Sequence, residues 1–135
     1  MDRISRQQRS AVMARVRAKD TTPEWLVRRA VHKMGFRYRL HRADLPGKPD
    51  MVFPRLKKII FVHGCFWHLH AGCPKSRLPA SNTSFWRQKL ERNRERDEQH
   101  RIALEAAGWS VLVLWECELR DPQRLDECLI KFLTD

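Results

Sequence analysis

Four residues whose side chains can bind metal ions have a spacing that is typical of a metal site. Cys65, His70 and Cys73 fall within nine residues, and Cys117 follows at the end of a later apolar segment. Thiolate and imidazole ligands in this number suit a tetrahedral zinc ion. Such an ion would clamp a polar loop, which has little core of its own, to the rest of the fold. The spacing therefore predicts a structural Zn²⁺ site.

Alternatives to this zinc site remain open from the sequence. The cysteines could be reduced core residues and His70 a surface residue, without a shared metal. His68 competes with His70 as the ligand, and a metal-bound His68 could not serve as a base. Cys128 lies on the apolar face of the expected last helix, which is more typical of a core cysteine. Disulfides would need an exported protein, and we expect none from the polar start of the sequence.

A second group of side chains has the chemistry of phosphodiester hydrolysis. Asp50 begins one expected strand, His63 ends another, and His68 lies just beyond it. A carboxylate at a strand end can hold Mg²⁺, which can polarise a phosphate and help generate the nucleophile. A neutral histidine can accept the proton of the attacking water. A Pro-Asp pair by itself is more often a turn, so this prediction depends on the neighbouring histidines.

One face of an expected long helix mixes aromatic and polar residues. Spacings of three, four and four place four residues on that face: Trp86, Lys89, Asn93 and Asp97. A buried helix face is normally apolar, so this stripe indicates a helix that faces a site. Asp97 could then hydrogen-bond His68 and fix its tautomer. The alternative is a solvated face, because charged residues surround the stripe.

Aromatic residues lie beside the histidines. Phe66 and Trp67 separate Cys65 from His68, and Phe85 precedes Trp86 at the start of the long helix. Aromatic side chains can stack on bases or wedge into a base step, and opening the step costs less at a mismatch. Core packing is the usual alternative, and we expect it for Phe85. A short polar loop offers little room to bury Phe66 and Trp67.

The remaining sequence supplies the elements that must position these groups. Apolar periodicity, caps and breakers predict helices over 5–18, from Thr21-Thr22-Pro23 to Gly35, from 83 or 84 to 107 and from Asp121-Pro122 onward, and strands over 36–41, 50–53, 57–63 and 109–116. This order predicts an α/β fold, a mixed sheet flanked by helices, as a single domain over 1–135. The strand over 109–116 is apolar enough for the sheet centre. Glu24 is either a helix-start residue or a contact to the water shell of a metal.

Charge indicates a polyanionic partner. The chain carries 27 Lys and Arg against 16 Asp and Glu, a net charge of +11. Residues 1–42 hold 12 basic and 3 acidic residues, whereas residues 116–135 hold 3 basic and 6 acidic ones. Nucleic acid is the first candidate, although a merely soluble basic surface is an alternative. We expect residues 1–20 to form a DNA-contacting arm.

The same sequence argues against membranes and export. No apolar stretch approaches the roughly 20 residues that a membrane span needs, and the polar start does not fit a signal peptide. We expect a cytoplasmic protein without a membrane partner.

Three segments together resemble a known family. They are Phe-Val-His-Gly-Cys-Phe-Trp-His-Leu-His at 61–70, Leu-Pro-Gly-Lys-Pro-Asp at 45–50 and Trp-Glu-Cys at 115–117. The chain resembles the very short patch repair (Vsr) DNA mismatch endonucleases, from its N-terminal Arg/Met segment to about Leu119. The Gly-Cys-Phe-Trp-His run is the most specific part of the resemblance.

The resemblance implies a restriction-endonuclease-like fold and a function. Family members recognise a T·G mismatch left by deamination of 5-methylcytosine and nick the strand 5′ to the mispaired T. The implied cofactors are catalytic Mg²⁺ and structural Zn²⁺, and the implied partners are double-stranded DNA, mismatch-repair proteins and a DNA cytosine methyltransferase system. The expected location is the bacterial nucleoid. One nick needs one active site, so we expect a monomer.

Matching positions assign roles within this chain. Asp50 and the backbone carbonyl of Val62 correspond to Mg²⁺ ligands, and His68 to the general base. Asp97 corresponds to the partner of that base. His63 and Glu24 correspond to residues that support the metal-bound waters and the phosphate. The zinc ligands correspond to Cys65, His70, Cys73 and Cys117. The DNA contacts fall on two arm residues, three intercalating aromatics and the polar helix face: Met13, Val16, Phe66, Trp67, Trp86, Lys89 and Asn93.

The chain also departs from the family pattern. Val62 replaces a Thr, which suffices if only its carbonyl is used. The Glu-x-Lys motif of this nuclease fold is absent, so a histidine mechanism is expected. The loop before Cys73 is one residue longer, and we expect no family contact of the kind that a longer tail makes. The rival hypotheses are a restriction-type nuclease with another target and a zinc-stabilised, sequence-specific DNA-binding module.

Overall fold

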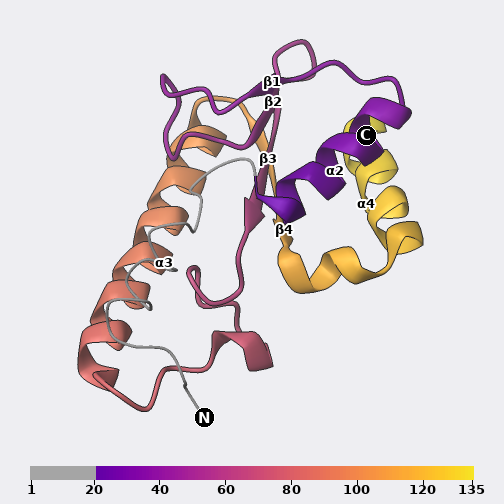
Figure 1. Ribbon diagram of the computed structural model, residues 1–135. Coiled ribbons are helices and arrows are strands. Elements are labelled where there is room, and N and C mark those ends of the chain that lie inside the picture. The colour runs from indigo at the N-terminus through magenta and orange to yellow at the C-terminus, as the bar shows by residue number, and fades with distance from the viewer. Residues whose placement is uncertain (1–20) are drawn as a thin grey trace.

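The computed structural model describes residues 21–135 (Figure 1). The expected arm at 1–20, with Met13 and Val16, lies outside the described residues. The elements in chain order are α2 (Thr22–Lys33), β1 (Arg39–Leu40), β2 (Met51–Phe53), β3 (Lys58–His63), the short 3-10 helix η1 (Pro74–Ser76), α3 (Thr83–Ala106), β4 (Ser110–Trp115), the 3-10 helix η2 (Glu116–Arg120) and α4 (Pro122–Thr134). Between residues 21 and 135, no helix has the length and apolar character needed to cross a bilayer.

The four strands form one mixed sheet in the order β1-β2-β3-β4. β1 pairs with β2, and β2 with β3, in antiparallel hairpins. β4 runs parallel to β3, with His63 opposite Trp115. A parallel pair needs a long crossover, and α3 lies within that connection. The predicted α/β class, a mixed sheet flanked by helices, is confirmed.

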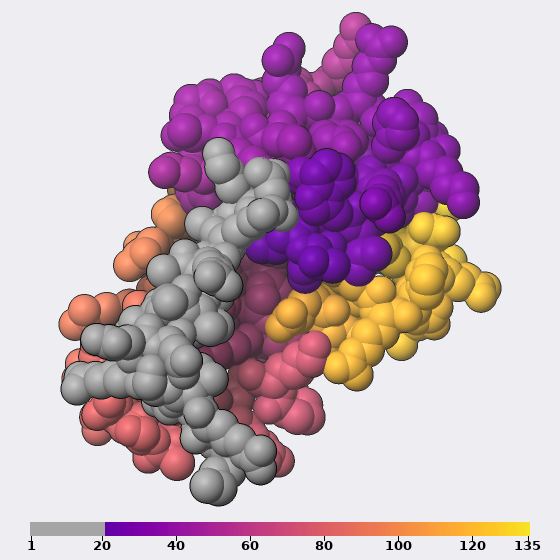
Figure 2. Space-filling view, in the orientation of Figure 1, coloured from indigo at the N-terminus to yellow at the C-terminus, as the bar shows by residue number. Residues whose placement is uncertain are grey.

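Helices cover both faces of the sheet, as Figure 1 shows, with α3 on one side and α2 and α4 on the other. Alternation along β2 and β3 divides their buried side chains between two cores. Met51 and Ile60 pack with α2 and α4, whereas Val52 and Ile59 pack with Leu104 of α3. In Figure 2 the indigo surface of α2 lies directly against the yellow C-terminal segment.

The start of α2 follows the sequence signals and positions a catalytic candidate. Thr21 is the N-cap, and its side chain accepts a hydrogen bond from the backbone N–H of Glu24 at 3.4 Å. Pro23 lies in the first turn, where its missing N–H costs nothing. These features fix the helix start, so Glu24 projects from the first turn. Its side chain is only 4% exposed, which is unusual for a mere helix-start residue.

Several sequence predictions need correction. β4 is an edge strand of the described sheet, not a central one, because the parallel crossover adds it outside β3. Only Arg39–Leu40 of the expected strand at 36–41 pairs, since Phe36 and Tyr38 turn toward the core instead. Phe85 is 58% exposed and not a core residue. The α3 helix lacks a side-chain N-cap bond, and its flanking residue Asn82 is left-handed with φ of 55°.

Candidate active site and metal centre

Two carboxylates approach one another where α2 meets the β1–β2 hairpin. Asp50 directly precedes β2, and its Oδ2 accepts a hydrogen bond from the backbone N–H of Val62 in β3 at 2.6 Å. Ligand atoms of Glu24, His41 and Asp50 all lie within 4.8 Å of one another. Arg28, one helical turn after Glu24, donates to its Oε2 at 2.9 Å. Glu24 and Asp50 are thus brought together, as the family resemblance implied.

The electrostatics of this pair favour a cation. Burial, together with the negative charge of Glu24, raises the pKa of Asp50 to about 8, against the bond from Val62. Ionising two neighbouring carboxylates together is costly where burial removes them from water. A divalent cation removes that cost, and oxygen ligands are those that Mg²⁺ prefers. The donor set therefore fits Mg²⁺.

His41 belongs to this group, although sequence reasoning missed it. Its Nε2 lies 3.1 Å from Oε2 of Glu24 and 3.3 Å from a guanidinium nitrogen of Arg28. The backbone of His41 has φ of 46°. This left-handed conformation is uncommon for residues other than glycine, and where it occurs it is often at a functional site. Its place at the end of the expected strand, across the hairpin from Asp50, was the available signal.

His68 and Asp97 form a hydrogen-bonded pair, as the stripe on the long helix predicted. Nδ1 of His68 lies 2.5 Å from Oδ2 of Asp97. A histidine that donates from Nδ1 keeps Nε2 free to accept a proton. From the same stripe, the side-chain amide of Asn93 donates to the backbone carbonyl of Trp67 at 3.2 Å. The long helix therefore faces the site and anchors the loop that carries His68.

His63 packs against the His68–Asp97 pair. Its ring is stacked on His68, with centroids 3.9 Å apart and planes 4° from parallel. Burial, followed by the charge of His68, lowers the pKa of His63 to about 4, against the effect of Asp97. His63 is therefore neutral at physiological pH. Within residues 21–135, its buried Nδ1 has no hydrogen-bond partner.

One backbone torsion assigns the two competing histidines to different sites. Leu69, which separates them, has φ of 49°. This left-handed residue turns the chain, so that His68 pairs with Asp97 while His70 reaches the cysteines. The sequence left open which histidine accompanies the cysteines, and the fold places His70 among them.

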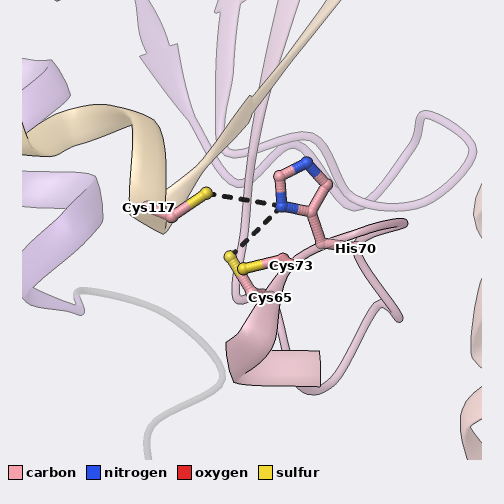
Figure 3. Close-up of side chains that lie close together, drawn as sticks. All are labelled: Cys65, His70, Cys73 and Cys117. Carbon is pink, nitrogen blue, oxygen red and sulfur yellow. Dashed lines mark hydrogen bonds between the residues drawn. The ribbon is translucent and has the colours of Figure 1, made fainter. Parts of the chain in front are cut away.

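The predicted cysteine and histidine cluster assembles around one point (Figure 3). Nδ1 of His70 lies 3.5 Å from Sγ of Cys65 and 3.4 Å from Sγ of Cys117. Zn–S and Zn–N bonds in a tetrahedron place sulfur and nitrogen about 3.6 Å apart. Cys73 completes the cluster, with all four ligand atoms within 4.8 Å of one another. The longer loop before Cys73 therefore accommodates the cluster, and the donor set fits zinc.

The cysteine thiols differ in their electrostatics. Burial raises the pKa of Cys65 to about 12. A hydrogen bond from the backbone of Lys75 is the main cause that lowers the pKa of Cys73. Metal ligation requires thiolates, so a cation must supply the charge that ionises Cys65. Cys128 is half-buried against the core on α4 and lies outside the cluster, as expected.

The three aromatic candidates gather beside His63 and His68. Phe66 and Trp67 are stacked with centroids 5.0 Å apart, and Trp86 meets both rings at 5.6 and 6.0 Å. Nζ of Lys89 lies 5.9 Å from the ring centroid of Trp67 and 5.7 Å from that of Trp86. The rings are half-buried. They form a cationic, aromatic rim suited to bases and phosphates.

A single cleft connects the carboxylates, the histidines and the aromatic rim. Its volume is about 700 Å³, and its lining includes Glu24, Asp50, Val62, His63, Phe66, Trp67, His68 and Asp97. Glu116 also lines it, and its Oε1 accepts a hydrogen bond from the backbone N–H of Cys65 at 3.2 Å. Sequence reasoning gave Glu116 no role, although it directly precedes Cys117.

The chain is similar to known endonucleases over most of its length. The sequence model of the family described as DNA mismatch endonuclease Vsr matches residues 1–75. The type II nicking enzyme V.XorIIP of Xanthomonas oryzae pv. oryzae is 49% identical over 98% of this chain and 96% of its own. The type II nicking enzyme V.NmeAIP of Neisseria meningitidis is 44% identical over 89% of this chain and 85% of its own. The DNA mismatch endonuclease Vsr of Escherichia coli is 39% identical over 94% of this chain and 81% of its own.

These relatives and the cleft define the class of protein. The chain is a DNA endonuclease. It belongs to the family of the DNA mismatch endonuclease Vsr.

Proposed function

We propose that this endonuclease nicks DNA 5′ to the T of a T·G mismatch that arises by deamination of 5-methylcytosine, in a reaction that depends on Mg²⁺. The main support is that the His68–Asp97 pair and the buried Asp50–Glu24 pair line the same cleft. One pair has the chemistry of a general base, and the other that of a cation site. A DNA-binding module without catalysis would need neither.

Each catalytic candidate has a role in the proposed reaction. Asp50 and the backbone carbonyl of Val62 would hold Mg²⁺, and Glu24 and His63 would contact its waters and the phosphate. Mg²⁺ in this place would stabilise the negative charge that develops on the phosphate. His68 accepts the proton of the attacking water, while Asp97 holds the imidazole in the required tautomer.

Replacing His68 with alanine should lower the single-turnover nicking rate by about two to four orders of magnitude, because a positioned base contributes that much. Asp97→Asn should lower the rate less, by about ten- to a hundredfold, since the base remains but loses its orientation. Glu98→Gln is the matched control, because this exposed neighbour on α3 pairs only with Arg101 among the described residues. Full activity of His68→Ala would disprove the base assignment.

The Cys65, His70, Cys73 and Cys117 cluster is proposed to bind structural Zn²⁺. The ion would clamp the loop that carries His68 and the aromatic residues to the end of β4. The fold is proposed to be restriction-endonuclease-like, as one domain over 1–135 that acts as a monomer. Met13 and Val16 of the arm at 1–20 are proposed to enter the minor groove.

Phe66, Trp67 and Trp86 are proposed to insert beside the mismatch, with Lys89 and Asn93 contacting the DNA next to them. Trp67→Ala should weaken binding to a T·G duplex by about five- to a hundredfold, because stacking contributes about 1–3 kcal/mol per base. Binding to the T·A duplex should change less than threefold, since a matched step is harder to open. Fluorescence anisotropy at fixed salt measures both. Ile102→Ala, at an exposed position of α3, is the control, and equal losses on both duplexes would contradict insertion.

The proposed function is tested with an end-labelled duplex that carries one T·G mismatch, beside T·A and C·G duplexes of the same flanking sequence. We expect one nick 5′ to the T, in the T·G duplex alone and only with Mg²⁺. Cleavage of all three duplexes would instead assign a restriction-type nuclease. Tight binding without cleavage, across several flanking sequences, would assign a DNA-binding module. Mismatch-repair proteins and a DNA cytosine methyltransferase system are the proposed partners.

A further inference from the structure

Trp115 lies between the metal cluster and the catalytic histidines. Its ring is stacked on His70, with centroids 4.2 Å apart and planes 8° from parallel. It also meets His63 edge-on, with centroids 5.2 Å apart and planes at 76°. Because His63 is itself stacked on His68, a continuous row of rings runs from a cluster ligand to the proposed base.

The strand register explains this placement. Trp115 ends β4 and pairs with His63 at the end of β3, and cross-strand neighbours have their side chains in contact distance. Two residues further, Cys117 enters the metal cluster. The end of β4 thus contributes the ring that separates the cluster from the catalytic pair, and the first turn of η2 contributes a cluster ligand.

The surroundings leave these rings space to move. Trp115, His63, His68 and His70 all line a cavity of about 370 Å³ on the side of the sheet that faces α3. Rings beside such a space are held by their ring neighbours rather than by close packing on every side. Removing the indole would therefore allow the histidine rings to tilt.

We propose that Trp115 is a positioning residue that couples the metal cluster to the orientation of His63 and His68. When the cluster holds its ion, His70 is fixed, the indole stacked on it is fixed, and the indole edge sets the plane of His63. The stack between His63 and His68 then transmits this orientation to the base. This inference rests on the proposed function, because it takes His68 as the base and the cluster as a zinc site.

The kinetic test compares three variants. Trp115→Leu fills part of the space without a stacking ring, and Trp115→Phe restores a ring. We expect Trp115→Leu to lower kcat about tenfold with KM within twofold, and Trp115→Phe to remain within threefold of the wild type. Trp109→Leu, which alters a half-buried indole just before the same strand, should leave kcat unchanged. Wild-type kcat in Trp115→Leu would overturn the proposal.

A second readout needs no nicking. The imidazole C–H signals of His63 and His68 are followed by NMR with Zn²⁺ and then with Cd²⁺, whose larger size displaces His70. In the wild type the exchange should shift both signals, and in Trp115→Phe it should do the same. In Trp115→Leu both signals should start at displaced positions and no longer follow the exchange.

Unmoved signals in the wild type would overturn the coupling. If Trp115→Leu does not retain metal, the Trp115→Phe protein decides, since its signals must still follow the exchange. Failure of the wild type to nick the T·G duplex, with signals that still follow the metal, would reject the proposed function and leave the coupling in place.

Discussion

Replacing Asp50 with asparagine should abolish nicking and, at the same time, stabilise the Mg²⁺-free protein at neutral pH. Loss of a metal ligand removes several kcal/mol of transition-state stabilisation. At about 1.36 kcal/mol for each tenfold, the nicking rate should fall by about three orders of magnitude. Single-turnover nicking of the T·G duplex measures this loss.

The stabilisation follows from the sign of the pKa shift. Burial raises the pKa of Asp50 from 3.8 to about 8. Between these values the folded chain binds a proton that the unfolded chain does not. The contribution of Asp50 to the free energy of unfolding is therefore greatest below pH 4 and is lost as the pH rises toward 8. Asparagine does not titrate, so it removes this loss, and we expect a gain on the order of 1–3 kcal/mol at pH 7.

Urea denaturation at pH 5, 7 and 8.5, without Mg²⁺, measures this difference. The advantage of Asp50→Asn should grow with pH, and Mg²⁺ should stabilise the wild type but not the variant. Asp44→Asn is the matched control, because Asp44 is 63% exposed and paired with Arg42 in the preceding loop. An identical pH dependence in the wild type and Asp50→Asn would contradict the assignment.

Removing one cysteine of the metal cluster should produce the largest loss of stability. Cys117→Ser should abolish zinc binding and lower Tm by roughly 10–15 °C, as a loss of about 3 kcal/mol does in a chain of this size. None of the four cluster side chains belongs to either core of the sheet. The loop at 64–82 should therefore open first, become sensitive to proteases and carry His68 away from Asp97.

Metal content, Tm and limited proteolysis measure these effects. Cys128→Ser is the matched control, since Cys128 is half-buried on α4 and outside the cluster. Zinc affinity of the wild type should also rise with pH, because burial raises the pKa of Cys65 to about 12 and binding must release that proton. Unchanged metal content in Cys117→Ser, or an equal loss in Cys128→Ser, would contradict the cluster.

Much of the site was predictable because its signals are local. The cap and proline at the start of α2, the alternation in β3 and the spacing of Trp86, Lys89, Asn93 and Asp97 depend on residues within a few positions of one another. These signals, with the spacing of Cys65, His70 and Cys73, predicted the mixed α/β class and side chains that the structure brings together: the cysteine and histidine group and the His68–Asp97 pair. The family motifs, which are also short segments, supplied the endonuclease class.

Long-range packing explains the features that sequence reasoning missed. Apolar character predicted a central place for β4, but the crossover through α3 placed it at the edge. Apolarity reports contact with a core, and this edge strand, half-buried for most of its length, packs against both cores. In the same way, Phe85 has the composition of a core residue, but it lies on the exposed face of a helix that buries only Leu90 and Leu104.

The sequence by itself determined which chemical groups this chain carries: the cysteines and histidines, the carboxylates, and the spacing that pairs an imidazole with a carboxylate. Only the tertiary structure decided how they are divided between sites. The left-handed turn at Leu69 separates His68 from His70, and the strand register places Trp115 between His70 and His63. The raised pKa of Asp50 likewise requires Glu24, which lies 26 residues earlier in the chain. Residue types are local facts, whereas distances and burial arise only when distant segments pack together.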